Sequence, residues 1–114
     1  MPSETIFARI LRGEVPATFL HEDERCVAIR DVHPRAPFHA LVIPRQPIVS
    51  LGEAEPEDEA LLGHLLVVAR RVAEAAGHGA AFRVVANAGE GAGQSVMHLH
   101  LHVLAGREFA WPPG

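Results

Sequence analysis

Apolar and polar residues follow two different periods along this chain, and each period predicts a different kind of element. In residues 56–77, leucine, valine and alanine recur every three or four positions, which is the spacing of one apolar helix face, and Gly77 supplies a stop. A shorter stripe of the same spacing predicts a helix over residues 4–13, which Ser3 could cap and Pro16 would follow. The pattern therefore predicts one long and one short helix.

Short apolar stretches bounded by charged turns, prolines or glycines have the length and composition of β-strands. The predicted strands cover residues 18–22, 25–31, 39–44, 82–87 and 96–106. With the helices they give the order α-β-β-β-α-β-β, whose tight connections favour an α+β fold with a mainly antiparallel sheet. A length of 114 residues fits a single domain, residues 1–114.

Composition and charge narrow the classes of function. The net charge is −4 and no block of lysine and arginine is present, so we expect no nucleic-acid-binding surface. The longest apolar run near the middle, "LLVVA", is too short to cross a bilayer, and the N-terminus lacks the pattern of a signal peptide. The single cysteine, Cys26, excludes an intramolecular disulfide and a multi-cysteine zinc site. These features predict a cytoplasmic protein without membrane association.

The chain has eight histidines, and three of them form one pattern. His98, His100 and His102, here called the triad, alternate with leucine and valine in the predicted strand 96–106. Because successive side chains on a strand point to opposite faces, the triad should share one face and the apolar residues should face the long helix. The other histidines are scattered and are expected to be ordinary surface or loop residues. They are at positions 21, 33, 39, 64 and 78.

A metal ion shared by the whole triad is not expected. Alternate strand positions lie roughly 6.6 Å apart, so the two outer histidines would be separated by about 13 Å. Each imidazole reaches a zinc ion only about 5.5 Å from its Cβ, so the two fall short together. Two neighbours could share an ion with a third ligand, but the sequence offers no nearby cysteine or carboxylate at ligand spacing. We therefore expect no metal and no cofactor.

An anion is the ligand that the triad and its surroundings favour. Imidazoles donate hydrogen bonds to phosphate near neutral pH. The preceding segment "AGEGAGQS", residues 88–95, has glycines that let the backbone approach a ligand, and Ser95 adds a hydroxyl. A histidine nitrogen can also attack phosphorus, and His100 is flanked on both sides by suitable partners. A histidine-rich strand without chemistry is the remaining alternative.

The motif "HLHLHVL" resembles the signature of the histidine triad (HIT) family. The segments "TIFARILRGEVPA", "ALVIP", "LLGHL", "GQSVMHLHLHVLAGR" and "WPPG" are similar to the Hint branch of that family, the histidine triad nucleotide-binding proteins. This resemblance implies a HIT-like fold, with a five-stranded sheet, one short N-terminal helix and one long helix. It also implies a homodimer whose sheets join across the two-fold axis.

The resemblance implies hydrolysis of nucleoside 5′-phosphoramidates, such as AMP linked to an amine or to lysine. In that scheme His100 attacks the α-phosphorus, the amine leaves, and water then cleaves the nucleotidyl-histidine. His98 and His102 match residues that orient the nucleophile and contact phosphate. His39 matches a fourth family histidine beside the triad, and Ser95 matches a hydroxyl near the leaving group. The scheme needs no metal and no cofactor.

Further positions match the family's purine-nucleotide pocket. Asp31 matches the ribose-binding carboxylate, although a carboxylate at this strand end could simply cap a turn. Phe7 and Ile10 match apolar walls around the base and could equally be core residues. The nucleotide-binding set that the resemblance implies is Phe7, Ile10, Ile29, Asp31, Val32, Asn87, Gly93, Gln94, Ser95, Val96, His100 and His102.

Departures from the branch are few, and two other functions stay open. Arg30 and Pro47 stand where histidines are common, and Met97 stands where an aromatic residue is common. Arg30 borders the nucleoside pocket that the resemblance implies, so base preference is in doubt, but no expected catalytic group is missing. The alternatives are a nucleotide-binding regulatory partner with weak hydrolysis and a dinucleoside polyphosphate hydrolase. The apolar tail residues Phe109 and Trp111 need cover, which agrees with the homodimer that the resemblance implies.

Overall fold

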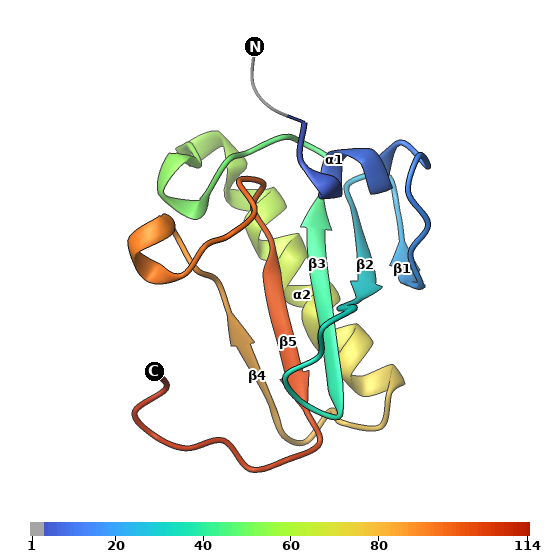
Figure 1. Ribbon diagram of the computed structural model, residues 1–114, viewed down its shortest axis with the longest axis vertical. Coiled ribbons are helices and arrows are strands. Elements are labelled where there is room, and N and C mark those ends of the chain that lie inside the picture. The colour runs from blue at the N-terminus through green and yellow to red at the C-terminus, as the bar shows by residue number, and fades with distance from the viewer. Residues whose placement is uncertain (1–3) are drawn as a thin grey trace.

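The computed structural model describes residues 4–114, and its centre is one antiparallel sheet with the strand order β1-β2-β3-β5-β4. The strands are β1 (Phe19–Glu22), β2 (Cys26–Arg30), β3 (Phe38–Pro44), β4 (Phe82–Val85) and β5 (Leu101–Ala105). The helices are α1 (Ile6–Leu11) and α2 (Glu59–Ala75), and three short 3₁₀ segments, η1 (Leu51–Glu53), η2 (Pro56–Asp58) and η3 (Glu90–Ala92), lie in the connections. The predicted α+β fold is confirmed (Figure 1).

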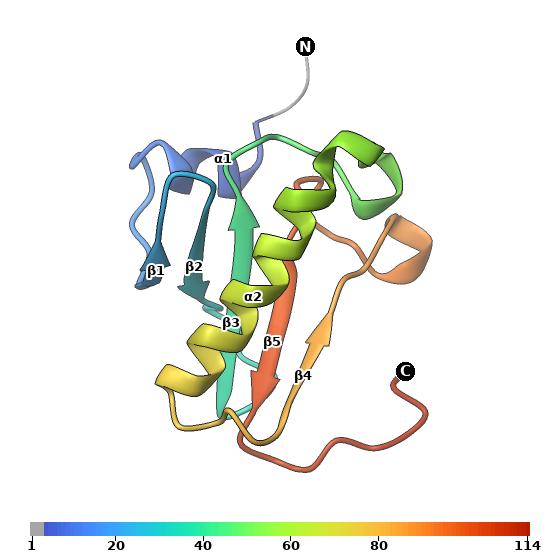
Figure 2. The same ribbon diagram turned by 180° about the vertical axis from the view of Figure 1, so that it is seen from behind.

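The long helix α2 covers one face of the sheet, as Figure 2 shows. Its apolar positions Leu65, Val68 and Val72 are buried against this face. Leu99, Leu101 and Val103 lie in the same core cluster, so the predicted direction of the apolar residues in the histidine segment is confirmed. At about 25 cal/mol per Å² of buried apolar area, this layer is the main favourable contribution to folding.

The short helix α1 lies over the opposite face, near one end of β2 and β3 (Figure 1). Its apolar positions Phe7 and Ile10 are buried in a second cluster with Ile29 and Leu41. Thr5 caps the helix, because its Oγ1 accepts the N–H of Ala8 at 3.0 Å. The predicted cap, the residue at position 3, lies outside the described residues.

The last strand is shorter than the pattern predicts. It begins at Leu101 and not at residue 96, because the neighbouring strand β3 ends at Pro44, which has no N–H to donate. The segment before β5 is held instead by the N–H of Leu99, which donates to the carbonyl of Ile48 at 2.7 Å. His98 and His100 therefore lie ahead of the strand, and His102 lies within it.

Among residues 4–114, none of the helices combines the length and the apolar composition that crossing a bilayer requires.

Candidate active site

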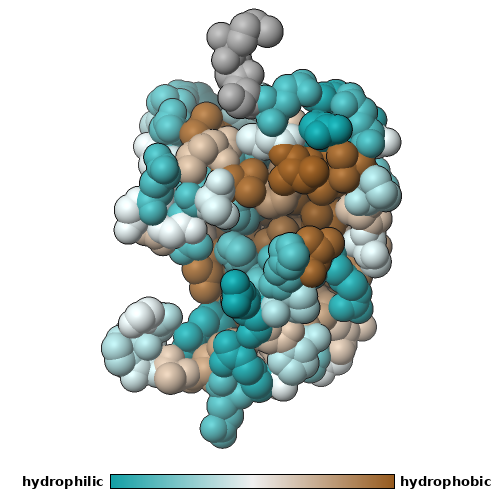
Figure 3. Space-filling view, in the orientation of Figure 1, coloured by the Kyte–Doolittle hydropathy of each residue, from teal (hydrophilic) through white to brown (hydrophobic). Residues whose placement is uncertain are grey.

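A cavity of about 470 Å³ opens on the face of the sheet that α1 partly covers. Figure 3 shows apolar side chains gathered on this face, beneath α1 and over β2 and β3. The predicted site residues that line the cavity are Phe7, Ile10, Ile29, Asp31, Val32, His39, Ser95, Val96, His100 and His102. The predicted site residues that do not line it are Asn87, Gly93, Gln94 and His98.

The ring of His100 is held in one tautomer by its backbone surroundings. Its Nδ1 lies 2.8 Å from the carbonyl oxygen of His98, and since a carbonyl only accepts, Nδ1 carries the proton. In a neutral ring, Nε2 then carries the lone pair. Within the described residues no hydrogen bond engages Nε2, and no side-chain nitrogen or oxygen is both buried and unpartnered, so this atom is open to the cavity. The edge-on ring of Phe7, 4.9 Å away between centroids, packs against the imidazole.

His102 carries the opposite tautomer, which a chain of three residues imposes. The backbone N–H of Arg35 donates to Nδ1 of His39 at 3.0 Å, so the proton of a neutral His39 is on Nε2. That Nε2 lies 2.9 Å from Nδ1 of His102, to which it donates. The proton of His102 is therefore on Nε2, and because the ring lines the cavity, this N–H can donate to a ligand there. A lone pair on His100 and a donor on His102 thus adjoin the same space.

Burial favours the neutral form of His39 and His102 at the cavity and of the neighbouring His98. Burial lowers the pKa of His102 to about 4, and the neighbouring His100 and His39 lower it further while Asp31 opposes them. Burial also lowers the pKa of His39, against the charge of Asp31. The pKa of His98 is lowered by burial too, although the carbonyl of Pro44 acts against this. Neutral rings are what the two tautomers require.

His98 serves the backbone and not the cavity. Its side chain is only 3% exposed, and Nε2 donates to the carbonyl of Pro44 at 2.8 Å. This bond ties the segment before β5 to the end of β3. The carbonyl of His98 in turn accepts the proton of His100. The structure therefore gives His98 an orienting contact with His100 and no position on the cavity wall.

The glycine-bearing loop before the triad is built around the side chain of Gln94. Its amide nitrogen donates to the carbonyls of Val49 and Val96, and its oxygen accepts the N–H of Gly89. Gly93 has a φ of +97°, a left-handed conformation that favours glycine, and the amide of Asn87 lies beside it. The loop delivers Ser95 to the cavity, while the buried side chain of Gln94 is engaged by Gly89, Val49 and Val96.

Comparison with known proteins places the chain among relatives of the same architecture. The family model of the HIT domain matches residues 12–109. The chain belongs to the HIT family. An uncharacterised HIT-like protein of Synechocystis is 54% identical over 114 residues, all of both chains. The crystal structure of a HIT family hydrolase of Legionella pneumophila has a TM-score of 0.95 at 41% identity, covering 97% of this chain and 100% of that one. A histidine triad protein of Clostridium difficile has a TM-score of 0.90 at 37% identity, covering 96% of each chain.

A carboxylate does lie near the triad of this HIT protein. Oδ2 of Asp31 is 3.4 Å from Nε2 of His39, and ligand atoms of Asp31, His39 and His102 all lie within 4.8 Å of one another. The premise that no carboxylate stands close to the triad is therefore wrong. It failed because the loop after β2 brings Asp31 beside a residue on β3. A cation at this site would use these three side chains, and only one of them belongs to the triad.

Several wall residues were not predicted. The segment after α1 contributes three of them, and β3 and its preceding loop contribute others. They are Ile6, Val15, Pro16, Ala17, His33, Arg35 and Leu41. Leu41 lies in an apolar stretch that predicts a buried strand, but its place opposite His102 comes only from the strand register. Arg35 has no signal in the sequence, because its contribution is the backbone N–H that fixes His39. Asp31 does cap a turn, as its Oδ1 accepts the N–H of His33 at 2.8 Å.

Proposed function

We propose that this HIT protein hydrolyses nucleoside 5′-phosphoramidates, such as AMP linked to an amine or to lysine, through a nucleotidyl-histidine intermediate. The observation that carries the proposal is the pairing of two tautomers at one cavity. His100 offers a free Nε2 lone pair, and the neighbouring His102, whose ring centroid is 5.0 Å away, offers an Nε2–H. A nucleophile beside a hydrogen-bond donor is what attack on a phosphoryl group needs.

In the first step, Nε2 of His100 attacks the α-phosphorus and the P–N bond to the amine breaks. The imidazole becomes cationic, and its Nδ1–H already donates to the carbonyl of His98, so the positive charge forms next to a fixed acceptor. The Nε2–H of His102 donates to a phosphoryl oxygen. The departing nitrogen takes a proton from the hydroxyl of Ser95 on the cavity wall, and solvent water returns a proton to that hydroxyl.

In the second step, water attacks phosphorus, the P–N bond to His100 breaks and the extra proton of the water passes to solvent, which releases the nucleoside monophosphate and restores the neutral ring. The P–N bond of a phosphorylated imidazolium is reactive, so water can break it. The Nε2–H of His102 can donate to a phosphoryl oxygen in this step as in the first. The backbone of residues 93–95 and the side chain of Asn87 are proposed phosphate contacts. Asn87 and Gly93 do not line the present cavity wall, so this contact requires phosphate to reach the loop.

The nucleoside would occupy the apolar part of the cavity. Phe7, Ile10 and Ile29 form buried walls of the kind that a purine ring needs. Val32 is 82% exposed at the cavity edge and would be covered by the base. Asp31 keeps one carboxylate oxygen 3.4 Å from His39 and can accept from the ribose hydroxyls.

We also propose a cytoplasmic homodimer. Trp111 in the C-terminal tail is 82% exposed, which a large aromatic side chain seldom is unless a partner covers it. Phe109 is covered differently from the prediction, since the guanidinium groups of Arg83 and Arg107 lie 5.1 Å and 4.3 Å from its ring centroid. Analytical ultracentrifugation at micromolar concentration should give the mass of two chains, and a single-chain mass would contradict the proposal.

Turnover of an AMP-amine and of a diadenosine polyphosphate, measured side by side, tests the proposed activity. The AMP-amine should be the far better substrate, and acid-sensitive nucleotide should be trapped on the protein by rapid quenching. Preference for the diadenosine compound would favour the alternative hydrolase, and tight AMP binding without turnover would favour a regulatory protein.

A further inference from the structure

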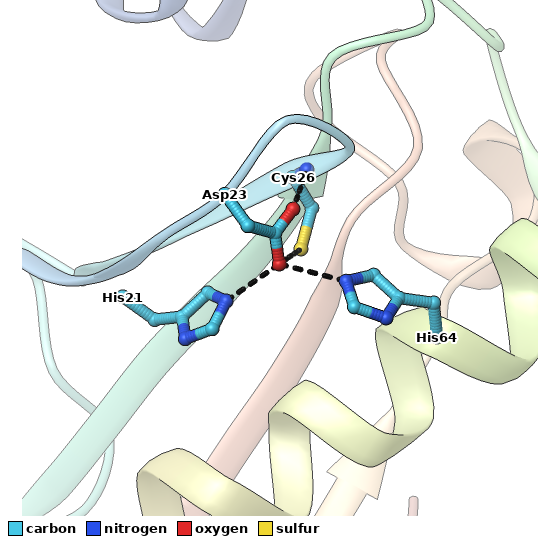
Figure 4. A group of neighbouring side chains, drawn as sticks. All are labelled: His21, Asp23, Cys26 and His64. Atoms are coloured by element: carbon cyan, nitrogen blue, oxygen red, sulfur yellow. Dashed lines mark hydrogen bonds and ion pairs between the residues drawn. The ribbon is translucent and has the colours of Figure 1, made fainter.

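A second group of metal-ligating side chains lies on the face of the sheet opposite to the cavity, where the β1–β2 hairpin meets α2 (Figure 4). It consists of His21 on β1, Asp23 in the turn, Cys26 on β2 and His64 on α2, here called the hairpin cluster. The expectation that His21 and His64 are ordinary surface or loop residues is wrong. Their side chains are 23% and 19% exposed, and both point at the same carboxylate.

The contacts converge on a single atom. Nε2 of His21 and Nε2 of His64 each lie 2.7 Å from Oδ2 of Asp23, and Sγ of Cys26 lies 3.7 Å from the same oxygen. The other carboxylate oxygen is occupied, because Oδ1 accepts the N–H groups of Arg25 and Cys26 at 2.7 Å and 2.8 Å. The turn thus fixes the carboxylate, and its free side faces two imidazoles and a thiol.

We propose that the hairpin cluster is a binding site for a divalent transition metal ion, with Zn²⁺ as the preferred ion. Two imidazole nitrogens, one carboxylate oxygen and one sulfur make a four-ligand set that suits the tetrahedral coordination of zinc. Because all four ligands come from the protein, the site has no open position for a substrate, and its role is to fasten the hairpin to α2.

The spacing of the four atoms is close to what the ion needs. Bonds of about 2.0–2.3 Å in a tetrahedron put the ligand atoms roughly 3.3–3.7 Å apart. The sulfur-to-oxygen distance, 3.7 Å, already fits, whereas the two nitrogen-to-oxygen distances of 2.7 Å are short by less than 1 Å. The imidazoles have to retreat from the carboxylate, and both are partly exposed and free to do so. Cys26 is fully buried and fixes the inner end of the site.

The proton balance of binding involves one thiol. Without the ion, burial together with the charge and hydrogen bond of Asp23 raises the pKa of Cys26 to about 12, so the residue is a thiol. When the ion binds, the sulfur–metal bond forms and the thiol proton passes to solvent. The imidazoles give up their hydrogen bonds to Asp23 and coordinate through the same Nε2 atoms, each proton moving to Nδ1 of its ring.

Titration of the whole chain with Co²⁺ in place of Zn²⁺ tests the site, because tetrahedral cobalt with a thiolate ligand has a charge-transfer band in the near ultraviolet. Cys26 is the only cysteine in the chain, so this band reports the hairpin cluster and nothing else. We expect the band to saturate at one ion per chain and to disappear when Zn²⁺ displaces Co²⁺. Cys26→Ser should abolish it, and His64→Gln or His21→Gln should weaken cobalt binding at least tenfold.

Two controls make the test specific. His78→Gln removes a histidine outside the cluster, and Asp31→Asn removes a ligand from the group at the cavity, so both should leave the band unchanged. His64→Gln alters a partly exposed helix position and should fold, which circular dichroism in a chelator verifies. No charge-transfer band with folded wild-type protein would overturn the proposal. So would a band of equal strength and affinity in the His64→Gln and His21→Gln variants, or metal binding that only Asp31→Asn abolishes.

Discussion

Histidines gather on both faces of the same sheet, and the two groups are assembled in different ways. At the cavity, His100 and His102 are two residues apart, and their neighbours fix the position of each proton. At the hairpin cluster, His21 and His64 are far apart in the sequence and meet only because α2 packs across the hairpin. The first group offers a lone pair and a donor to a ligand, whereas the second is closed around one carboxylate. The difference teaches that residue spacing along one segment can place two imidazoles beside a ligand. The side chains that join two elements of the fold are brought together only by packing.

The largest expected effect comes from removing the nucleophile. His100→Ala should lower phosphoramidate turnover on the order of a thousandfold or more, because only slow direct attack by water remains. Nucleotide affinity should fall at most roughly a hundredfold, since one hydrogen bond to a charged group contributes about 1.5–3 kcal/mol. Steady-state kinetics and calorimetric titration with AMP measure the two quantities. Near-normal turnover in this variant would refute the proposal that His100 is the nucleophile.

The cavity group could be predicted from the sequence in one respect, because alternate side chains of a strand point to opposite faces of a sheet. The alternation in residues 98–103 predicted the buried side of Leu99 and Leu101, and the structure confirms it. The same alternation predicted too long a strand, because it contains no information on where the neighbouring strand β3 ends. The imino nitrogen of Pro44 ends the pairing there.

The remaining parts of both sites depend on contacts between distant segments. His39 on β3 pairs in register with Leu104, two residues along β5 from His102, and the bond between the two histidines joins residues 63 positions apart. Family resemblance, and not spacing, pointed to His39. The Arg35 N–H that sets the tautomer is a backbone group, for which side-chain identity gives no signal. The hairpin cluster was missed for the same reason, since nothing in the sequence links position 64 with position 21.

A core substitution beside the nucleophile separates stability from chemistry. Leu99 is 2% exposed and faces α2, opposite to the cavity. Leu99→Ala should reduce the free energy of unfolding by about 2–5 kcal/mol through lost burial and a residual cavity. At a temperature where the variant is folded, the tautomer-setting contacts persist and turnover should stay within a fewfold of the wild type. Urea denaturation gives the first quantity and the amine-release assay the second. A loss of turnover as large as that of His100→Ala would show that the two faces are not separable.

Acid should lower the free energy of unfolding in two separate pH ranges, one for each group. His102 has an ordinary pKa of 6.5 that falls to about 4 in the folded protein, so the unfolded chain binds more protons between these values. The contribution of His102 to the free energy of unfolding is therefore fully present above about pH 6.5 and is lost as the pH falls towards 4. Its size is about 3 kcal/mol, at about 1.4 kcal/mol per tenfold change in proton affinity. The lowered pKa values of His39 and His98 act in the same direction.

The hairpin cluster responds at lower pH. Burial of Asp23 is outweighed by hydrogen bonds from His21, from His64 and from the turn N–H groups, which hold its pKa well below the ordinary value of 3.8. Its contribution is present above that value and is lost as the pH falls further. Urea denaturation across pH 3–7 should show both declines in the metal-free protein, and Asp23→Asn should remove the lower one only. A stability that stays constant between pH 6.5 and 4.5 would contradict neutral, buried imidazoles at the cavity.

The smallest expected effect on turnover is that of a strong chelator, and it separates the two groups most cleanly. A chelator should strip the hairpin cluster of its ion and lower the melting temperature, because a ligand that binds only the folded state stabilises it. Turnover of an AMP-amine should be unchanged below that temperature, since in the proposed mechanism His100 supplies the nucleophile and His102 the donor without an ion. Among residues 4–114, Asp31, His39 and His102 are the one group at the cavity that could hold a cation, which gives the opposite result a definite meaning. If chelation abolished turnover and Zn²⁺ restored it in a Cys26→Ser background, the active ion would be at the cavity. The bond from His39 to His102 would then belong to the metal-free form only, and the tautomers derived from it would not be those of the working enzyme.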